Sequence, residues 1–235
     1  MRLAILFLTL AVQTAPKTTL DGAYTNEQAS RGAAAYVAKC ASCHREDLTG
    51  FNGPPLKGDM FMDHWREFNV NVLFDVIATT MPRGQERLSE SEYLDIQAYL
   101  LQQNGLPAGE TELSPESVRQ TLLVGKDGPK PLPTSTPVDV VGCLTLFPGA
   151  GWFLTNAAEP ARTMDQWQLT PEESIAAKSK ALAGLRFRLQ DIADAPGFNP
   201  DVFADNKIEV KGLLVRQPGN ERVNVTAVQM IGTCK

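Results

Sequence analysis

The sequence predicts an α+β protein of two domains, and three features of its 235 residues point that way. In residues 18–106, apolar side chains recur every three or four positions, as on one face of a helix. From residue 138 onward, β-branched residues and a period of two predict strands. Residues 107–137 hold six prolines and little periodicity, and this composition is typical of a semi-extended linker.

Capping boxes mark the starts of two helices in the first domain. Thr25 is followed three residues later by Gln28, and Ser89 is followed by Glu92. In both pairs the hydroxyl and the longer polar side chain can satisfy free amides at a helix N-terminus. The first helix is expected to end near Cys40, and a short third helix is expected over residues 70–79.

The second domain is expected to contain five strands and one helix. Thr170 is a suitable N-cap for a helix over residues 171–182, between the second and third strands. Five short strands with one helix favour a small closed or partly open barrel. The expected strands are residues 138–147, 152–156, 185–190, 208–215 and 223–230.

The most informative motif is Cys40-Ala41-Ser42-Cys43-His44, directly after the first helix. C-x-x-C-H is the attachment signature of c-type haem, and it predicts one covalent haem c with His44 as proximal iron ligand. A redox dithiol is the first alternative, but that motif is expected near a βαβ pattern. A zinc site would need a second nearby cysteine pair, whereas Cys143 and Cys234 are far away in sequence.

The N-terminus predicts export. An apolar run over residues 3–12 follows Arg2; it is too short to span a bilayer but suits a secretory signal. We therefore interpret residues 1–17 as a signal peptide, with Ala15 as a possible cleavage point; a buried strand and an uncleaved anchor are the alternatives. We expect a periplasmic or otherwise exported protein with no other membrane segment. The net charge of −5 gives no electrostatic support for nucleic-acid binding.

Residues 24–105 resemble a class I cytochrome c domain. The resemblance includes Gly32 and Tyr36 in the first helix, the haem motif, and the final helix. The strongest similarity is to cytochrome domains of quinoprotein alcohol dehydrogenases, attached or separate. The class I resemblance also includes Gly53-Pro54-Pro55-Leu56 and Met81-Pro82. The similarity to the dehydrogenase cytochromes is carried by Thr80-Met81-Pro82 and Glu92-Tyr93-Leu94-Asp95-Ile96-Gln97-Ala98-Tyr99-Leu100.

This resemblance implies a role for each residue around the haem. Met81 would be the distal ligand, and a thioether there raises the reduction potential. The Pro54 carbonyl would accept the proximal imidazole N–H, and Leu56 would pack on the proximal haem face. His64 is the alternative distal ligand. Met60 and Met62 are expected to pack around the porphyrin, and Trp65 or Arg83 to meet a propionate.

Residues 138–235 more weakly resemble small secreted OB-like domains. Cys143 lies in the first expected strand and Cys234 follows the last, and these strands can be neighbours in a barrel. A disulfide between them is expected in an exported protein, with two free thiols as the alternative. The runs that carry the resemblance are Gly142-Cys143-Leu144, Val210-Lys211-Gly212-Leu213 and Val223-Asn224-Val225-Thr226.

Together these features predict a non-catalytic electron-transfer protein with a haem domain (18–106), a linker (107–137) and a β domain (138–235). Its expected partners are redox proteins: a quinoprotein dehydrogenase on one side and a terminal oxidase or another cytochrome on the other. The alternative is a haem-based sensor whose β domain binds a ligand or partner. A vacant sixth iron position would favour the sensor, whereas Met81 favours electron transfer.

Overall fold

The computed structural model describes residues 17–234, so the expected signal peptide lies almost entirely outside the described residues. The chain divides into two compact units, Met1–Gly128 (unit 1) and Pro129–Lys235 (unit 2). None of the helices in the described part combines the length and the apolar character needed to cross a membrane.

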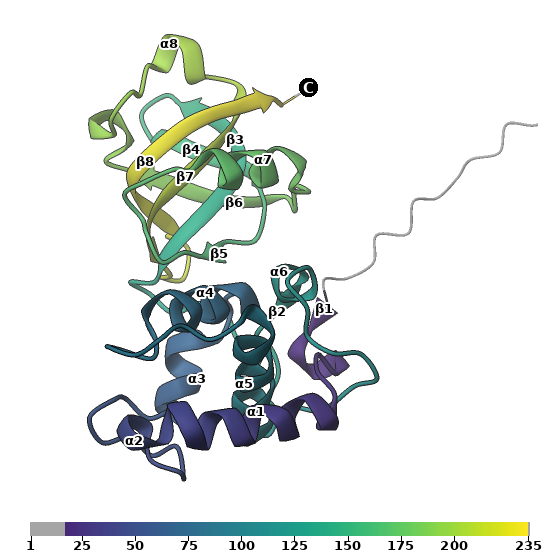
Figure 1. Cartoon of the computed structure of the whole chain (residues 1–235). Helices are drawn as coiled ribbons and strands as arrows, with labels where there is room; N and C mark the ends of the chain where they lie inside the picture. Colours follow the sequence, from purple (N-terminus) through teal and green to yellow (C-terminus); the bar gives the residue numbers. More distant parts are fainter. Residues whose placement is uncertain (1–16, 235) are drawn as a thin grey trace, which may run out of the picture. The chain divides into compact units, whose positions relative to one another are not determined.

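Unit 1 is built on the crossing of two long helices, α1 and α5 (Figure 1). Thr25 and Ser89 cap these helices, each accepting a hydrogen bond from the backbone amide three residues on. The predicted capping box is complete only at Ser89, where Glu92 accepts from the Ser89 amide; the Gln28 side chain bonds Leu113 instead. Gly32 permits the crossing, because a Cβ there would lie 1.8 Å from the Asp95 carbonyl oxygen. The helices are α1 (Asn26–Lys39), α2 (Ala41–His44), α3 (Asp59–Trp65), α4 (Val70–Thr80), α5 (Glu90–Gln103) and α6 (Ser117–Gln120).

Residues 107–128 are part of unit 1, which corrects their interpretation as linker. Leu113, Val118 and Leu123 are buried in the same apolar cluster as α3, α4 and α5. The Gln28 side chain bonds both the amide and the carbonyl of Leu113. The short strands β1 (Lys17–Thr18) and β2 (Thr121–Leu122) pair in parallel, which ties this segment to the start of the described chain.

Unit 2 contains a six-stranded sheet in the order β4-β6-β8-β7-β3-β5. A further pairing between β3 and β4 closes all of these strands except β5 into a ring of five. The sixth strand, β5, has two residues and was not expected from the sequence. The expected long strands all form, with slightly different ends. The elements are β3 (Pro137–Phe147), β4 (Gly151–Ala157), β5 (Ala161–Arg162), α7 (Pro171–Ser179), β6 (Leu185–Gln190), α8 (Pro200–Phe203), β7 (Asn206–Val215) and β8 (Arg222–Thr233).

The two faces of the sheet in unit 2 bury different side chains. Val140, Leu154 and Val210 belong to the large apolar cluster. On the opposite face, Val141 packs with Ala177 of α7 and with Ile231. Since Val140 and Val141 are adjacent on β3, they point to opposite faces of the sheet, and α7 covers the face that Val141 occupies.

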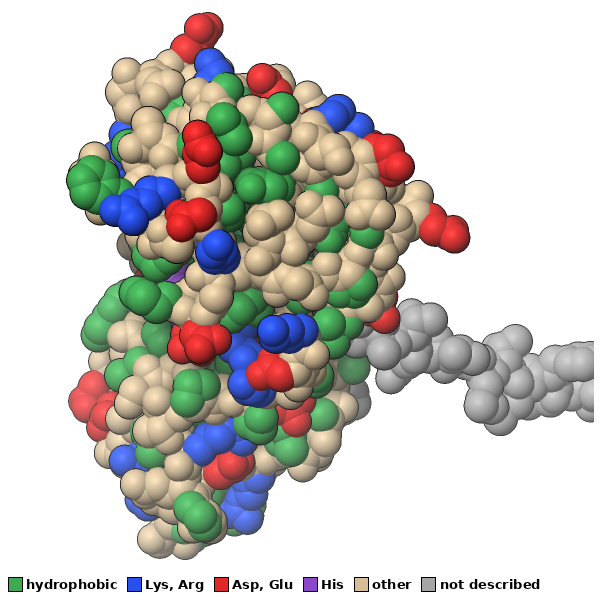
Figure 2. Space-filling view, turned by 90° about the horizontal axis from the view of Figure 1, so that it is seen from below, with side chains coloured by type: hydrophobic (Ala, Val, Ile, Leu, Met, Phe, Trp, Pro, Cys, Tyr) green, Lys and Arg blue, Asp and Glu red, His purple; other side chains and the backbone are tan. Residues whose placement is uncertain are grey.

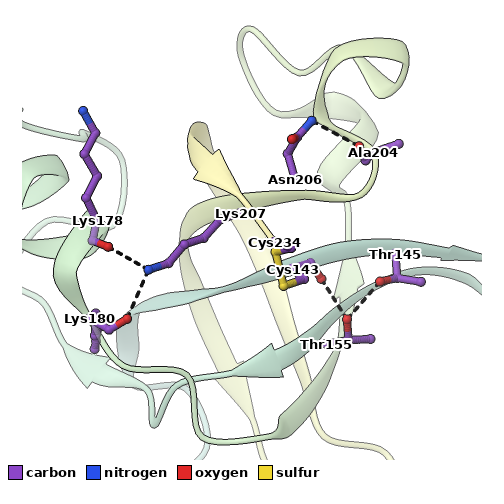
Figure 3. The surroundings of a disulfide bond; sticks show 9 residues. All are labelled: Cys143, Thr145, Thr155, Lys178, Lys180, Ala204, Asn206, Lys207 and Cys234. Carbon is purple, nitrogen blue, oxygen red and sulfur yellow. Dashed lines mark hydrogen bonds between the residues drawn. A yellow bond between two sulfur atoms is a disulfide. The ribbon is translucent and has the colours of Figure 1, made fainter. Parts of the chain in front are cut away.

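Cys143 and Cys234 form a disulfide, with their Cα atoms 5.8 Å apart (Figure 3). The bond connects β3 to the end of the chain, just after β8. On the face of the molecule drawn in Figure 2, acidic and basic side chains are interspersed, without a large patch of either sign.

Candidate functional site

A cavity of about 400 Å³ opens in unit 1, and its walls are largely apolar. It is lined by side chains from α1 to α5, among them Phe61, Leu73 and Ile96. It brings together residues that are far apart in sequence. The residues predicted to bind the haem line it: Cys40, Cys43, His44, Pro54, Leu56 and Met81.

His44 forms one wall of this cavity. A single helical turn, α2, follows α1 and carries the side chain inward, so that His44 is only 7% exposed. Its Nδ1 atom lies 2.7 Å from the Pro54 carbonyl oxygen. Because a carbonyl can only accept, Nδ1 carries the proton, and Nε2 is left as the nitrogen available to a metal. This geometry is the one that the resemblance implied for Pro54.

The loop after His44 fixes the position of the ring. The backbone amides of Phe51, Asn52 and Gly53 all donate to the Cys43 carbonyl, at 3.2, 3.1 and 3.1 Å. A Cβ at Gly53 would lie 2.4 Å from His44 Cε1, so a side chain there would displace the imidazole. This role of Gly53 was not predicted from the sequence, and the signal that could have indicated it is the place of Gly53 directly before Pro54.

Cys40 and Cys43 are free thiols at the edge of the cavity. Cys40 is half-buried and Cys43 is exposed. Burial, with a smaller contribution from Cys43, raises the pKa of Cys40 to about 11. A redox dithiol usually has a lowered pKa, so this environment differs from the one expected for the first alternative.

Met81 lies on the same cavity as His44, where α4 ends. Its carbonyl accepts a hydrogen bond of 2.6 Å from the Tyr93 hydroxyl on α5. The Arg87 guanidinium donates to the carbonyls of Ala78 and Thr79, at the end of α4. Neither Tyr93 nor Arg87 was given a role from the sequence, because only the folded loop brings them to the segment that carries Met81.

The other expected residues around the cavity differ in their surroundings. His64 lines the cavity but is exposed, and its ring meets Trp65 edge-on, with centroids 4.6 Å apart. Met60 also lines it and is 71% exposed, whereas Met62 packs against the neighbouring apolar cluster instead. Trp65 and Arg83 are lining residues as well.

This arrangement fits a c-type haem. The cavity offers the buried His44 imidazole, the Met81 thioether and the two thiols, within largely apolar walls that suit a flat apolar ring. Imidazole and thioether are the axial ligands of cytochromes c, and paired thiols supply the thioether links.

Residues 27–100 match the model of a family described as cytochrome c oxidase, cbb3-type, subunit III. The match runs from α1 into α5 and includes every predicted haem residue. It supports a c-type cytochrome domain in unit 1, with the haem binding and electron-transfer role that such a domain implies. No curated protein and no solved structure matches the chain.

Proposed function

We propose that this protein is an exported c-type cytochrome that transfers single electrons through one covalently attached haem c. The observation that carries the proposal is the placement of His44 and Met81 on one apolar cavity, with Cys40 and Cys43 at its edge. When bound, haem c supplies a one-electron iron couple. Met81 in this cavity favours electron transfer over the sensor alternative, because a filled sixth position leaves no site for a gaseous ligand.

The residues of the chain have separate roles in this function. Cys40 and Cys43 hold the macrocycle by thioether bonds, and the Pro54 carbonyl orients His44. Met81 would supply a thioether ligand to the iron, and such a ligand favours the reduced state. The largely apolar walls would limit the exposure of the group to solvent, which is one of the factors that set its potential.

Acid–acetone extraction tests covalent attachment. The haem should stay on the chain, and mass spectrometry should place it on the peptide with Cys40 and Cys43. A Cys40→Ala, Cys43→Ala double variant is the control, because its haem should be removed by the solvent. Complete extraction from the wild-type protein would contradict covalent attachment.

Substitution of Met81 tests the axial ligation. Met81→Ala should abolish the weak sulfur-to-iron band at the red end of the oxidised spectrum and should lower the reduction potential. His64→Ala is the matched control and should leave both unchanged, since His64 is exposed on the same cavity. The opposite result, a loss of ligation in His64→Ala alone, would assign the sixth position to His64.

The proposal extends to partners and to unit 2. Export is supported by the N-terminal apolar run, and the similarity of the Met81 and α5 segments supports a periplasmic quinoprotein dehydrogenase as electron donor. Stopped-flow mixing with such an enzyme should reduce the haem. In unit 2, the ring β3-β4-β6-β8-β7, with β6 and β8 parallel, supports an OB-like barrel acting as a docking or structural module.

A further inference from the structure

Three ionisable side chains of unit 2 lie on the outer face of the closed sheet, where α7 covers it. Glu209 and Lys211 on β7 are 0% and 1% exposed. Asp139 on β3 is directly opposite Lys211 in the strand register. Charged groups are rarely buried to this extent without a specific role or partner.

Polar contacts hold α7 on this face. Lys211 Nζ lies 2.7 Å from Glu173 Oε1 of α7 and 2.7 Å from the carbonyl oxygen of Gln168. The Gln229 amide donates to Ser174 Oγ of α7, and also to Glu209 Oε2 at 2.6 Å.

At the other end of α7, Lys207 Nζ donates to the carbonyls of Lys178 and Lys180, at 2.8 and 3.1 Å (Figure 3). Apolar contacts contribute little to the attachment of α7 to the sheet. Ala177 is the one residue of this helix in the buried cluster that α7 forms with the sheet. The attachment of α7 therefore depends mainly on hydrogen bonds and on one ion pair.

Asp139 on β3 and Glu209 on β7 point to the same face of the sheet from diagonal register positions, because Asp139 pairs with Lys211 and Val141 pairs with Glu209. Ionised carboxylates only accept hydrogen bonds, so neither group can bond the other unless one of them carries a proton. Asp139 Oδ1 and Glu209 Oε1 are also buried and have no hydrogen-bond partner among the described residues. The pair is therefore built to hold a proton, and it becomes costly when both groups are charged.

We propose that the Asp139–Glu209 pair is a proton-operated latch: α7 covers the sheet while the pair shares a proton, and α7 is released when that proton is lost. After the loss, two buried negative charges face Glu173 and compete with it for Lys211. Lys180, just after α7, is the other charged group near the pair. Release of α7 would admit water to the charged pair and expose the apolar patch around Val141.

The surroundings of each group give the direction of this switch. Burial, followed by the negative charge of Asp139, raises the pKa of Glu209 to about 7. Burial also raises the pKa of Asp139, although Lys180 and Lys211 oppose the rise. Burial disfavours the Glu173 carboxylate too, but hydrogen bonds from Lys211 and Thr170 outweigh it and lower the pKa of Glu173.

Glu173 is therefore already charged when the pair loses its proton near neutral pH. A raised pKa in the covered state means that this state binds more protons than the open one. The covering of the sheet by α7 should thus be strongest in mild acid, weaken as the pH rises from the ordinary carboxyl pKa of 4.5 towards about 7, and change no further above that value. For one proton released, protection should fall by up to about tenfold per pH unit between these two values, because only there do the covered and open states differ in bound protons.

Amide hydrogen exchange of the full-length holoprotein tests the latch. Exchange of peptides from residues 170–183 is measured from below the ordinary carboxyl pKa of 4.5 to above the raised pKa of about 7, and corrected for the intrinsic rate. We expect protection to fall steeply with rising pH in this segment. Peptides from β7 and β8 should stay protected, and an equal fall there would indicate loosening of the whole unit and would overturn the proposal.

A matched pair of variants identifies the titrating group. Glu209→Gln keeps the shape of the side chain and can still accept the hydrogen bond from Gln229, but it cannot ionise. The amides of α7 should therefore stay protected from exchange at all these pH values. Glu221→Gln removes a carboxylate that pairs with Arg216 in the same unit, and it should behave like the wild type. If Glu209→Gln fails to fold, Asp139→Asn gives the same test. A wild-type pH dependence in a folded variant of either pair residue would overturn the latch.

Discussion

At the residue scale, Gly53 limits where the His44 imidazole can lie. A Cβ at this position would be 2.4 Å from His44 Cε1 and 2.7 Å from Nδ1. Nδ1 is also the atom that bonds the Pro54 carbonyl. An added methyl group would thus displace the His44 ring and disturb its hydrogen bond to the Pro54 carbonyl, which sets the basicity of the imidazole.

Gly53→Ala should therefore disturb the haem and destabilise unit 1. Overpacking of this kind costs about 1–3 kcal/mol. We expect a shifted oxidised spectrum, a changed reduction potential and a lower urea midpoint. Gly232→Ala is the control, because no atom lies within 4 Å of the position that its Cβ would take. An unaltered spectrum and potential in Gly53→Ala would show that the ring can move aside at little cost.

At the element scale, residues 107–128 complete unit 1 through buried hydrogen bonds. Gln28 on α1 donates to the Leu113 carbonyl at 3.1 Å and accepts from the Leu113 amide at 2.7 Å. Thr19 bonds both backbone groups of Val124 in the same manner. These contacts lie in the interior, where an unpaired backbone group is costly.

Gln28→Ala should destabilise unit 1 by about 2–4 kcal/mol, because it leaves the amide and the carbonyl of Leu113 unpaired in the interior. Urea unfolding followed by haem absorbance measures the change. Gln120→Ala is the control, since this exposed side chain bonds only Glu116, and its effect should stay within about 0.5 kcal/mol. Equal midpoints for the two variants would show that the segment contributes little stability.

The sequence predicted elements with local signals best. Thr25 and Ser89 located the starts of α1 and α5, because an N-cap is a local motif, although the full capping box formed only at Ser89. The helix α3 was missed, since Gly58 precedes it without a side-chain cap. Residues 107–128 were misinterpreted because their few apolar residues, such as Leu113 and Val118, follow no period and are buried only by tertiary contacts.

The haem motif could be read from five adjacent residues, whereas the rest of the site depended on resemblance or on the fold. Spacing alone could not show that the Pro54 carbonyl reaches His44. Nor could it show that Tyr93 bonds the Met81 carbonyl, because these contacts join separate elements. Likewise, Asp139 and Glu209 are 70 positions apart, and only the β3–β7 register makes them neighbours.

At the scale of the whole molecule, each unit has an apolar core of its own. In unit 1 the core lies among the helices and includes Phe61 and Leu101. In unit 2 it lies inside the closed sheet and includes Leu144 and Val210. The haem site belongs to unit 1, and the one disulfide among the described residues belongs to unit 2.

Reduction of Cys143–Cys234 should therefore lower the melting temperature of unit 2 and leave the haem spectrum unaltered. The bond closes a loop with a sequence separation of 91, so in the entropic account it contributes about 4–5 kcal/mol. Calorimetry should be run with and without a dithiol, with ascorbate in both samples so that the iron stays in one redox state.

The Cys143→Ser, Cys234→Ser double variant is the control, and its melting should not respond to the dithiol. A dithiol does not cleave thioether links such as those proposed for Cys40 and Cys43, so only the disulfide should differ between the two samples. An unchanged melting temperature in the wild-type protein would contradict a stabilising bridge. A dithiol-dependent shift of the haem band would instead show that loosening unit 2 alters the iron site, which separate cores do not predict.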